Sequence, residues 1–238
     1  MAVDRTLDRS ISVAGAGEEV RSTFIRRTYA HLAGTIALFA GIEALLLGPL
    51  LEKTLPMMVW MLQGYNWLFV LGAFMVVGWI ADWWAHRDTS PALQYFGLLL
   101  TAVAYALIFM PLLYMAAYHS SPDLLPSAAI LTLGLFGGLT AVVFVTRKDF
   151  SFLRTGLMVG TFIALGLIVA AILFGFNLGV IFALAMVVLM GGYIVYYTSN
   201  VLHHYRPTQH VAAALALFAA VALMFYYIVY LLMSLSRD

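Results

Sequence analysis

Seven long apolar runs divide this chain, and their length is what most restricts the fold. A helix needs about 20 mainly apolar residues to cross the hydrocarbon of a bilayer, and runs of that order end here at charges, prolines or short polar clusters. The least marked break is FGFN at 174–177, where Gly175 and Asn177 indicate a tight turn. We predict seven membrane-spanning helices over 28–50, 58–80, 92–117, 127–146, 153–174, 178–202 and 211–234.

Composition supports the same reading. Hydrophobic residues make up 64% of the chain and charged residues 10%, whereas about a quarter of the residues of a soluble domain are charged. The chain is therefore predicted to be an integral, all-α membrane protein.

A net charge of +1 argues against nucleic acid as a partner, because affinity for a polyanion comes mainly from neutralising phosphates. No cysteine is present, which excludes thiol catalysis and cysteine-based metal sites.

The distribution of Lys and Arg predicts the orientation, because cytoplasmic loops carry the excess. With seven spans, the side of the N-terminus has ten such residues and the opposite side has two, Lys53 and Arg237. The N-terminus is therefore expected in the cytoplasm. Residues 1–24 are mixed in charge and contain no apolar core of signal-peptide length, so they are expected to form a mobile cytoplasmic tail. Residues 25–238 are expected to form one domain.

No common catalytic or nucleotide-binding motif occurs in the sequence. The G-x-x-x-x-G-K-[ST], H-E-x-x-H and G-x-S-x-G patterns are all missing. We therefore expect neither an enzyme nor a bound cofactor.

Two acidic residues stand within or beside the predicted spans, where ionisable groups are costly and are functional candidates. Glu43 lies toward the outer end of the first span. It is either an ion or proton site facing the bundle, or a carboxyl that reaches the interface or is protonated and hydrogen-bonded. Asp82 precedes Trp83 and Trp84 at the inner end of the second span, where interfacial solvation is the simpler explanation.

The histidines give weaker signals. His31, early in the first span, could titrate near neutral pH, although a packed or hydrogen-bonded histidine is the more common case. His203, His204 and His210 resemble a metal cluster, but adjacent helical side chains point about 100° apart and Pro207 indicates a loop. No metal site is predicted.

The sixth span carries an unusual polar stripe. Polar residues recur there at intervals of three and four, which places them along one helix face; they are Tyr193, Tyr196, Tyr197, Asn200 and then His203 or His204. A buried hydroxyl or amide without a partner costs about 1–3 kcal/mol. The stripe should therefore face protein or a water-filled cavity rather than lipid.

The seventh span has small residues at the spacing that allows close helix packing. Ala212, Ala216 and Ala220 follow one another every four residues, and small side chains let helix backbones approach closely in lipid. This helix is therefore expected to be surrounded by others.

The loop after the fourth span resembles a known family signature. LTAVVFVTRKDFSFLRTGLMVG at 139–160 is similar to the region of the Bax inhibitor family, including its bacterial YccA-like relatives, in which a T-[KR]-[KR]-D-[FL]-S loop joins the fourth and fifth spans. The loop residues are Arg147, Lys148 and Asp149. FIRRTYAHLAGTIALFAGIEALL at 24–46 resembles the first span of the family, YIVYYTSNVL its sixth and AAALALFAAVALMFYYIVYLL at 212–232 its seventh.

The resemblance implies a seven-helix bundle whose last helix lies at the centre, in the inner (plasma) membrane of a bacterium. Some members have a pH-sensitive calcium leak that depends on two aspartates, one in each of the last two spans. These positions fall on Tyr197 and Ala220 here. Neither residue can replace a carboxylate that coordinates calcium, so the calcium gate is expected to be absent.

Without the two aspartates, two functions are open for this chain. Bacterial members of the family associate with a membrane-anchored AAA protease, which implies a regulatory or partner-binding protein acting through surfaces in the bilayer and the cytoplasm. The alternative is a pH-sensitive leak for calcium or another cation that uses Glu43 and the tyrosine stripe.

Overall fold

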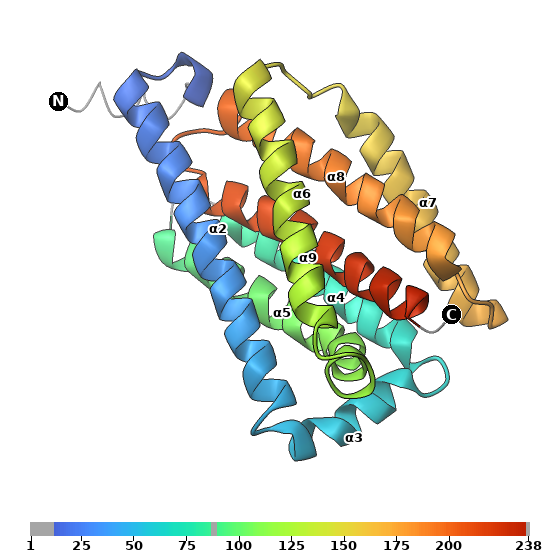
Figure 1. Cartoon of the computed structure of the whole chain (residues 1–238). Helices are drawn as coiled ribbons and strands as arrows, with labels where there is room; N and C mark the ends of the chain where they lie inside the picture. Colours follow the sequence, from blue (N-terminus) through green and yellow to red (C-terminus); the bar gives the residue numbers. More distant parts are fainter. Residues whose placement is uncertain (1–11, 87–89, 237–238) are drawn as a thin grey trace.

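Eight α-helices make up most of the protein, and a computed structural model describes them over residues 12–86 and 90–236 (Figure 1). A short 3₁₀ helix, η1 (Val13–Gly15), precedes them. The α-helices are α2 (Glu18–Leu47), α3 (Leu51–Leu62), α4 (Asn66–Ala85), α5 (Pro91–His119), α6 (Leu124–Thr146), α7 (Leu153–Phe174), α8 (Gly179–His203) and α9 (His210–Leu235).

Seven of these helices are long and apolar enough to cross a membrane, as the sequence predicts. They are all the α-helices except α3. The predicted break at FGFN is also confirmed, because α7 ends at Phe174 and Gly175 adopts a left-handed conformation with φ of 71°. Glycine takes up this conformation without the steric cost that a side chain would bring.

The second span is placed differently from the prediction of 58–80. Residues 51–62 form the separate helix α3, and its 12 residues cover about 18 Å at 1.5 Å per residue, well short of a hydrocarbon core of about 30 Å. Gly64, with φ of 53°, turns the chain into α4. The side-chain amide of Asn66 donates to the carbonyl of Trp60 at 2.8 Å and holds this turn. The spanning helix is therefore α4, and α3 lies across the end of the bundle (Figure 1).

The first helix begins earlier than the predicted tail would allow. α2 starts at Glu18, so residues 18–24 of the predicted 1–24 tail are helical. Val13 is fully buried, and its backbone N–H donates to the carbonyl of Tyr205 at 2.9 Å. Residues 1–11 of the predicted tail lie outside the described residues. Within the predicted tail, Val13 and Phe24 thus anchor the chain beside Tyr205, which follows α8, while Glu18 and Glu19 are exposed.

The final helix has the most buried surface of the seven long helices. It packs against α2, α4, α5, α6 and α8, and its small residues Ala212, Ala213, Ala214 and Ala220 are each at most 3% exposed. Small side chains allow these close approaches. The predicted membrane orientation, by contrast, depends on the charge distribution alone.

Cysteine labelling tests that orientation, because the natural chain has no cysteine. Lys148→Cys lies in the loop between α6 and α7, and Lys53→Cys lies in α3 at the opposite end. We expect a membrane-impermeant maleimide to label Lys53→Cys in intact cells and Lys148→Cys only after permeabilisation. The reverse pattern would mean that the N-terminus lies outside.

Candidate functional site

The interface between α8 and α9 holds the two positions that the family resemblance singles out. A Cβ atom placed on Gly191 would lie 3.7 Å from Cε of Met224. Because α8 and α9 run antiparallel, this pairing puts Tyr197 within one helical turn of the level of Ala220. Both residues belong to one continuous hydrophobic core. No Asp or Glu occurs in either helix.

The tyrosine stripe is packed inside the bundle to different degrees along its length. The rings of Tyr193 and Tyr197 stack with centroids 5.5 Å apart, and the ring of Tyr196 lies 5.3 Å from that of Tyr197. The Tyr193 hydroxyl forms a 2.8 Å hydrogen bond with the Thr161 hydroxyl of α7. Asn200 is partly buried, and its carbonyl accepts from the N–H groups of His204 and Tyr205. α7 thus provides one polar partner for the stripe.

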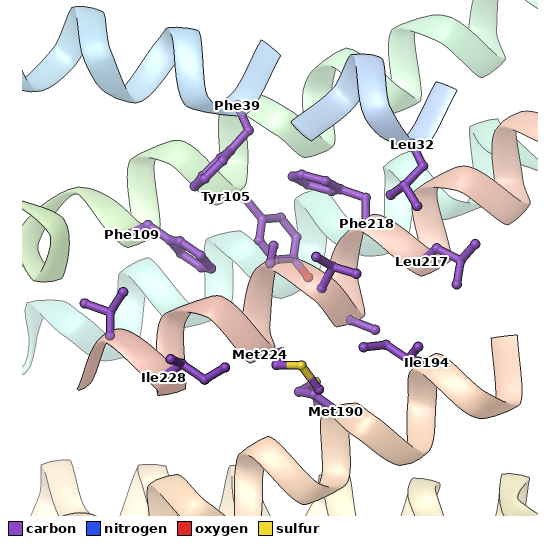
Figure 2. Close-up of a cluster of buried hydrophobic side chains, with 14 of the residues drawn as sticks. Leu32, Phe39, Tyr105, Phe109, Met190, Ile194, Leu217, Phe218, Met224 and Ile228 are labelled. Carbon is purple, nitrogen blue, oxygen red and sulfur yellow. The ribbon is translucent and has the colours of Figure 1, made fainter. Parts of the chain in front are cut away.

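Aromatic rings fill the middle of the bundle beside this interface (Figure 2). Tyr105 of α5 lies 5.3 Å from Phe218 of α9 and 5.6 Å from Phe109, measured between ring centroids. Phe39 of α2 completes the group at 5.4 Å from Phe109 and 6.0 Å from Phe218. Edge-to-face pairs of this kind stabilise a packed core. They form an aromatic layer that joins α2, α5 and α9.

Glu43 lies one turn beyond this layer. The buried face of α2 passes through Leu32, Thr35 and Phe39 to Glu43, whose residue is 6% exposed. Neither carboxyl oxygen has a hydrogen-bond partner among the described residues. Of the two interpretations of Glu43, this geometry fits a carboxyl that faces the bundle interior. A charge so placed would be costly.

Asp82 is in a different environment. Its side chain is 55% exposed at the end of α4, with one carboxyl oxygen 3.4 Å from the ring nitrogen Nδ1 of His86. The same ring nitrogen lies 2.9 Å from the backbone carbonyl of Asp82. This placement fits a solvated residue at the interface.

The family loop is pinned to the end of α8. Asp149 accepts a hydrogen bond from the backbone N–H of Ser151 at 2.8 Å, and its other oxygen lies 3.0 Å from Nε2 of His204. The hydroxyl of Ser199, which is fully buried, lies 3.5 Å from Asp149 and accepts from the backbone N–H of Phe150 at 2.9 Å. The bond from Ser151 lowers the pKa of the Asp149 carboxyl below its ordinary value, and His204 acts in the same direction.

The two basic residues of the loop are exposed beside this cluster. Arg147 closes α6 in the left-handed conformation, with φ of 51°, which is uncommon for a residue other than glycine. Lys148 follows it, and both side chains point toward solvent. The loop therefore presents positive charge outward while Asp149 holds it to α8.

The histidines are divided between two places. In the part of the chain that the structure describes, no three His, Cys, Asp or Glu residues are grouped so that they could hold a metal ion. The ring of His31 lies 5.0 Å from that of His210. Nδ1 of His31 is 2.7 Å from the carbonyl of Arg27, and Nε2 is 3.1 Å from the hydroxyl of Tyr95. His31 is thus a hydrogen-bonded residue that joins α2 to α5.

A second polar group lies deeper at the same end. Thr28 and Tyr29 of α2, Thr140 of α6 and Thr198 of α8 each have a buried side-chain oxygen without a well-formed hydrogen bond among the described residues. The Tyr29 hydroxyl faces those of Thr198 and Thr140. Buried polar atoms are usually paired, so this cluster makes the interior polar next to the family loop.

Sequence reasoning considered His204 only as a metal ligand or as the end of the tyrosine stripe, and it did not identify Ser199 or the threonine cluster as parts of a site. The Asp149–Ser151 bond was readable, because Asp often accepts from the N–H two residues later. The contacts of Asp149 with Ser199 and His204 join residues about fifty positions apart in the sequence. No local sequence pattern predicts such contacts.

An all-helical bundle with seven apolar helices of spanning length defines an integral membrane protein. Over residues 21–237 the chain matches the family described as "Inhibitor of apoptosis-promoting Bax1". The chain therefore belongs to the Bax inhibitor family.

Its relatives come from distant organisms. The chain is 26% identical to Protein lifeguard 4 of Mus musculus over 94% of this chain and 90% of the relative. It is also 26% identical to Bax inhibitor 1 of Schizosaccharomyces pombe, over 91% and 78%. The same identity, over 90% of both chains, relates it to an uncharacterised protein of Pseudomonas aeruginosa.

Replacing Asp149 by Asn tests the loop contact. We expect a loss of roughly 0.5–1 kcal/mol of stability at neutral pH, because the charged acceptor is half exposed and only part of its interaction energy is retained. Since the folded-state pKa is lowered, the wild-type contribution is present above the ordinary value of 3.8 and is lost as the pH falls through the lowered value. Thermal unfolding in detergent at several pH values measures both effects. Equal stability of the two proteins at neutral pH would contradict the assignment.

Proposed function

We propose that this protein is a regulatory or partner-binding member of the Bax inhibitor family that lacks the di-aspartate calcium gate. The observation that carries the proposal is the α8–α9 interface, where Tyr197 and Ala220 occupy the two gate positions and neither helix contains a carboxylate. We place the protein in the inner membrane of a bacterium and assign it no enzymatic activity.

The chemistry of calcium supports this view. Calcium takes six to eight hard oxygen ligands, largely carboxylates and carbonyls. A neutral phenol and a methyl group offer no negative charge to replace two aspartates. Tyr197 instead stacks on Tyr193 and packs in the core, which favours one closed packing of α8 on α9.

The cytoplasmic end offers a surface for a partner. Glu18, Glu19, Arg147 and Lys148 are all exposed there. The hydrogen bond from Val13 to Tyr205 and the Asp149 cluster hold the segments that carry these charges. A fixed, charged surface can give specificity and fast association. A membrane-anchored AAA protease is the partner that we propose.

Co-purification from native membranes tests this surface. The double variant Arg147→Ala, Lys148→Ala should lose most of the recovered protease, while Lys53→Ala, a charge removal at the opposite end, should leave it unchanged. Removing residues 1–11 tests the remaining tail without disturbing Val13 or Phe24, both of which are buried. Undiminished recovery with the double variant and the truncation would count against a cytoplasmic docking surface.

Glu43 favours a second candidate function, a leak for protons or cations including calcium. Its carboxyl is buried beyond the aromatic layer without a partner among the described residues, and such intramembrane carboxyls often mark ion pathways. The phenylalanine rings between Glu43 and the cytoplasmic polar cluster would have to move for ions to pass.

Ion flux in proteoliposomes separates the two functions. We expect wild type to show no calcium flux between pH 6 and pH 8, because both gate carboxylates are replaced. Tyr197→Asp, Ala220→Asp should introduce pH-dependent flux. Wild-type flux that Glu43→Gln abolishes would establish the leak and overturn our first proposal. Comparing proton with calcium flux in the same vesicles identifies the permeant ion.

A further inference from the structure

A deep crevice opens between α4 and α7 on the side of the bundle opposite the family loop. Its volume is about 520 Å³. α4 and α7 make little contact with each other, and the wall residues between them include Leu71, Phe74, Ile168 and Ala171. α9 forms the floor through Tyr226, Tyr227 and Tyr230. The crevice is therefore bounded by spanning helices on three sides.

The crevice extends over the depth of one membrane leaflet. Along α7 its lining reaches from Thr161 to Ile172, and the eleven steps between these two residues rise about 16 Å. Half of a hydrocarbon core of about 30 Å is about 15 Å. The outer end is marked by Trp67 at the start of α4 and Asn177 in the α7–α8 turn. Trp and Asn are residues that suit the membrane interface.

Apolar side chains beside the crevice face the surroundings. Met75, which lines the crevice on α4, is 52% exposed. On α7, Ile163 and Leu167 lie outside the lining and are 59% and 42% exposed. Such residues within spanning helices contact lipid hydrocarbon. The mouth of the crevice therefore opens to the bilayer rather than to water.

Three tyrosine hydroxyls lie in this apolar setting without hydrogen-bond partners among the described residues. The rings of Tyr226 and Tyr227 are 5.3 Å apart, and those of Tyr226 and Phe109 are 4.9 Å apart. Ring packing thus holds these side chains in place, and the tyrosines line the crevice. An unpaired polar group in hydrocarbon is costly, so an occupant that accepts hydrogen bonds would stabilise the floor.

We propose that the crevice binds one acyl chain of a glycerolipid from the outer leaflet, with the ester carbonyl oxygen accepting hydrogen bonds from the α9 tyrosines. The chain provides apolar contact with α4 and α7, and the ester lies at the depth where hydrocarbon gives way to polar headgroups. The head group then lies near Trp67 and Asn177.

The chemistry of the crevice favours an acyl chain over a protein helix. The walls are apolar and the floor offers hydroxyl donors, whereas the backbone carbonyls of a helix are already bonded within that helix. The site does not depend on the proposed function, because it uses none of the gate or loop residues.

Photolabelling in phosphatidylcholine vesicles tests the proposal, using a phosphatidylcholine that carries a diazirine on one acyl chain. We expect mass spectrometry to find crosslinks concentrated on crevice residues of α7 and α9. Ala171→Phe fills the crevice and should reduce these crosslinks about tenfold, which corresponds to one decade in affinity. Leu167→Phe, on the same helix but outside the crevice, should leave them unchanged.

A second set of variants tests the hydroxyls without altering the shape of the floor. The triple variant Tyr226→Phe, Tyr227→Phe, Tyr230→Phe keeps the rings, so folding should be retained while the crosslinks fall several-fold. Crosslinks spread evenly over exposed residues such as Phe162 and Ile181 would overturn the proposal. An equal effect of Ala171→Phe and Leu167→Phe would do the same.

Discussion

Hydrocarbon offers no hydrogen bonds, and every part of this structure follows from that constraint. In the seven long helices the backbone N–H and C=O groups form hydrogen bonds with one another. The turns at Gly64 and Gly175 lie between helices. Some polar side chains also have hydrogen-bond partners within the protein. Tyr193 finds Thr161 on α7, and Thr35, Thr101 and Thr132 donate to carbonyls of their own helices. Several polar groups have no such partner among the described residues. They include Glu43, the three tyrosines of the crevice floor, and the buried cluster of Thr28, Tyr29, Thr140 and Thr198.

Polar and aromatic groups are arranged by depth in the bundle. A polar cluster with Asp149, His204 and buried threonines occupies the end where the family loop lies. Phenylalanine and tyrosine rings fill the middle (Figure 2), and Glu43 and the crevice lie beyond them. A regulatory role needs only the first of these regions, whereas a leak needs a path through all three. The closed aromatic layer is one reason why we rank the regulatory role first.

Much of this architecture was readable from the sequence, because membrane helices are specified by long apolar runs with few other requirements. The seven spans and the FGFN break follow from this alone. The extra helix α3 was missed since its residues are as apolar as a span, and only the turn at Gly64 separates it from α4. Glu43 was recognised as a candidate, but its burial depends on how α2 packs against the rest of the bundle. The Asp149 contacts and the crevice join residues far apart in the chain, which periodicity does not detect.

α2 is a single unbroken helix of 30 residues, about 45 Å long, and it connects the two ends of the bundle (Figure 1). Its charged first turns stand beyond the hydrocarbon, His31 ties it to α5, and Glu43 lies near its far end. Because one helix carries both ends, Glu43 and the exposed Glu18 and Glu19 are parts of the same continuous element. A change in helix tilt, such as a different bilayer thickness would favour, would displace both ends together.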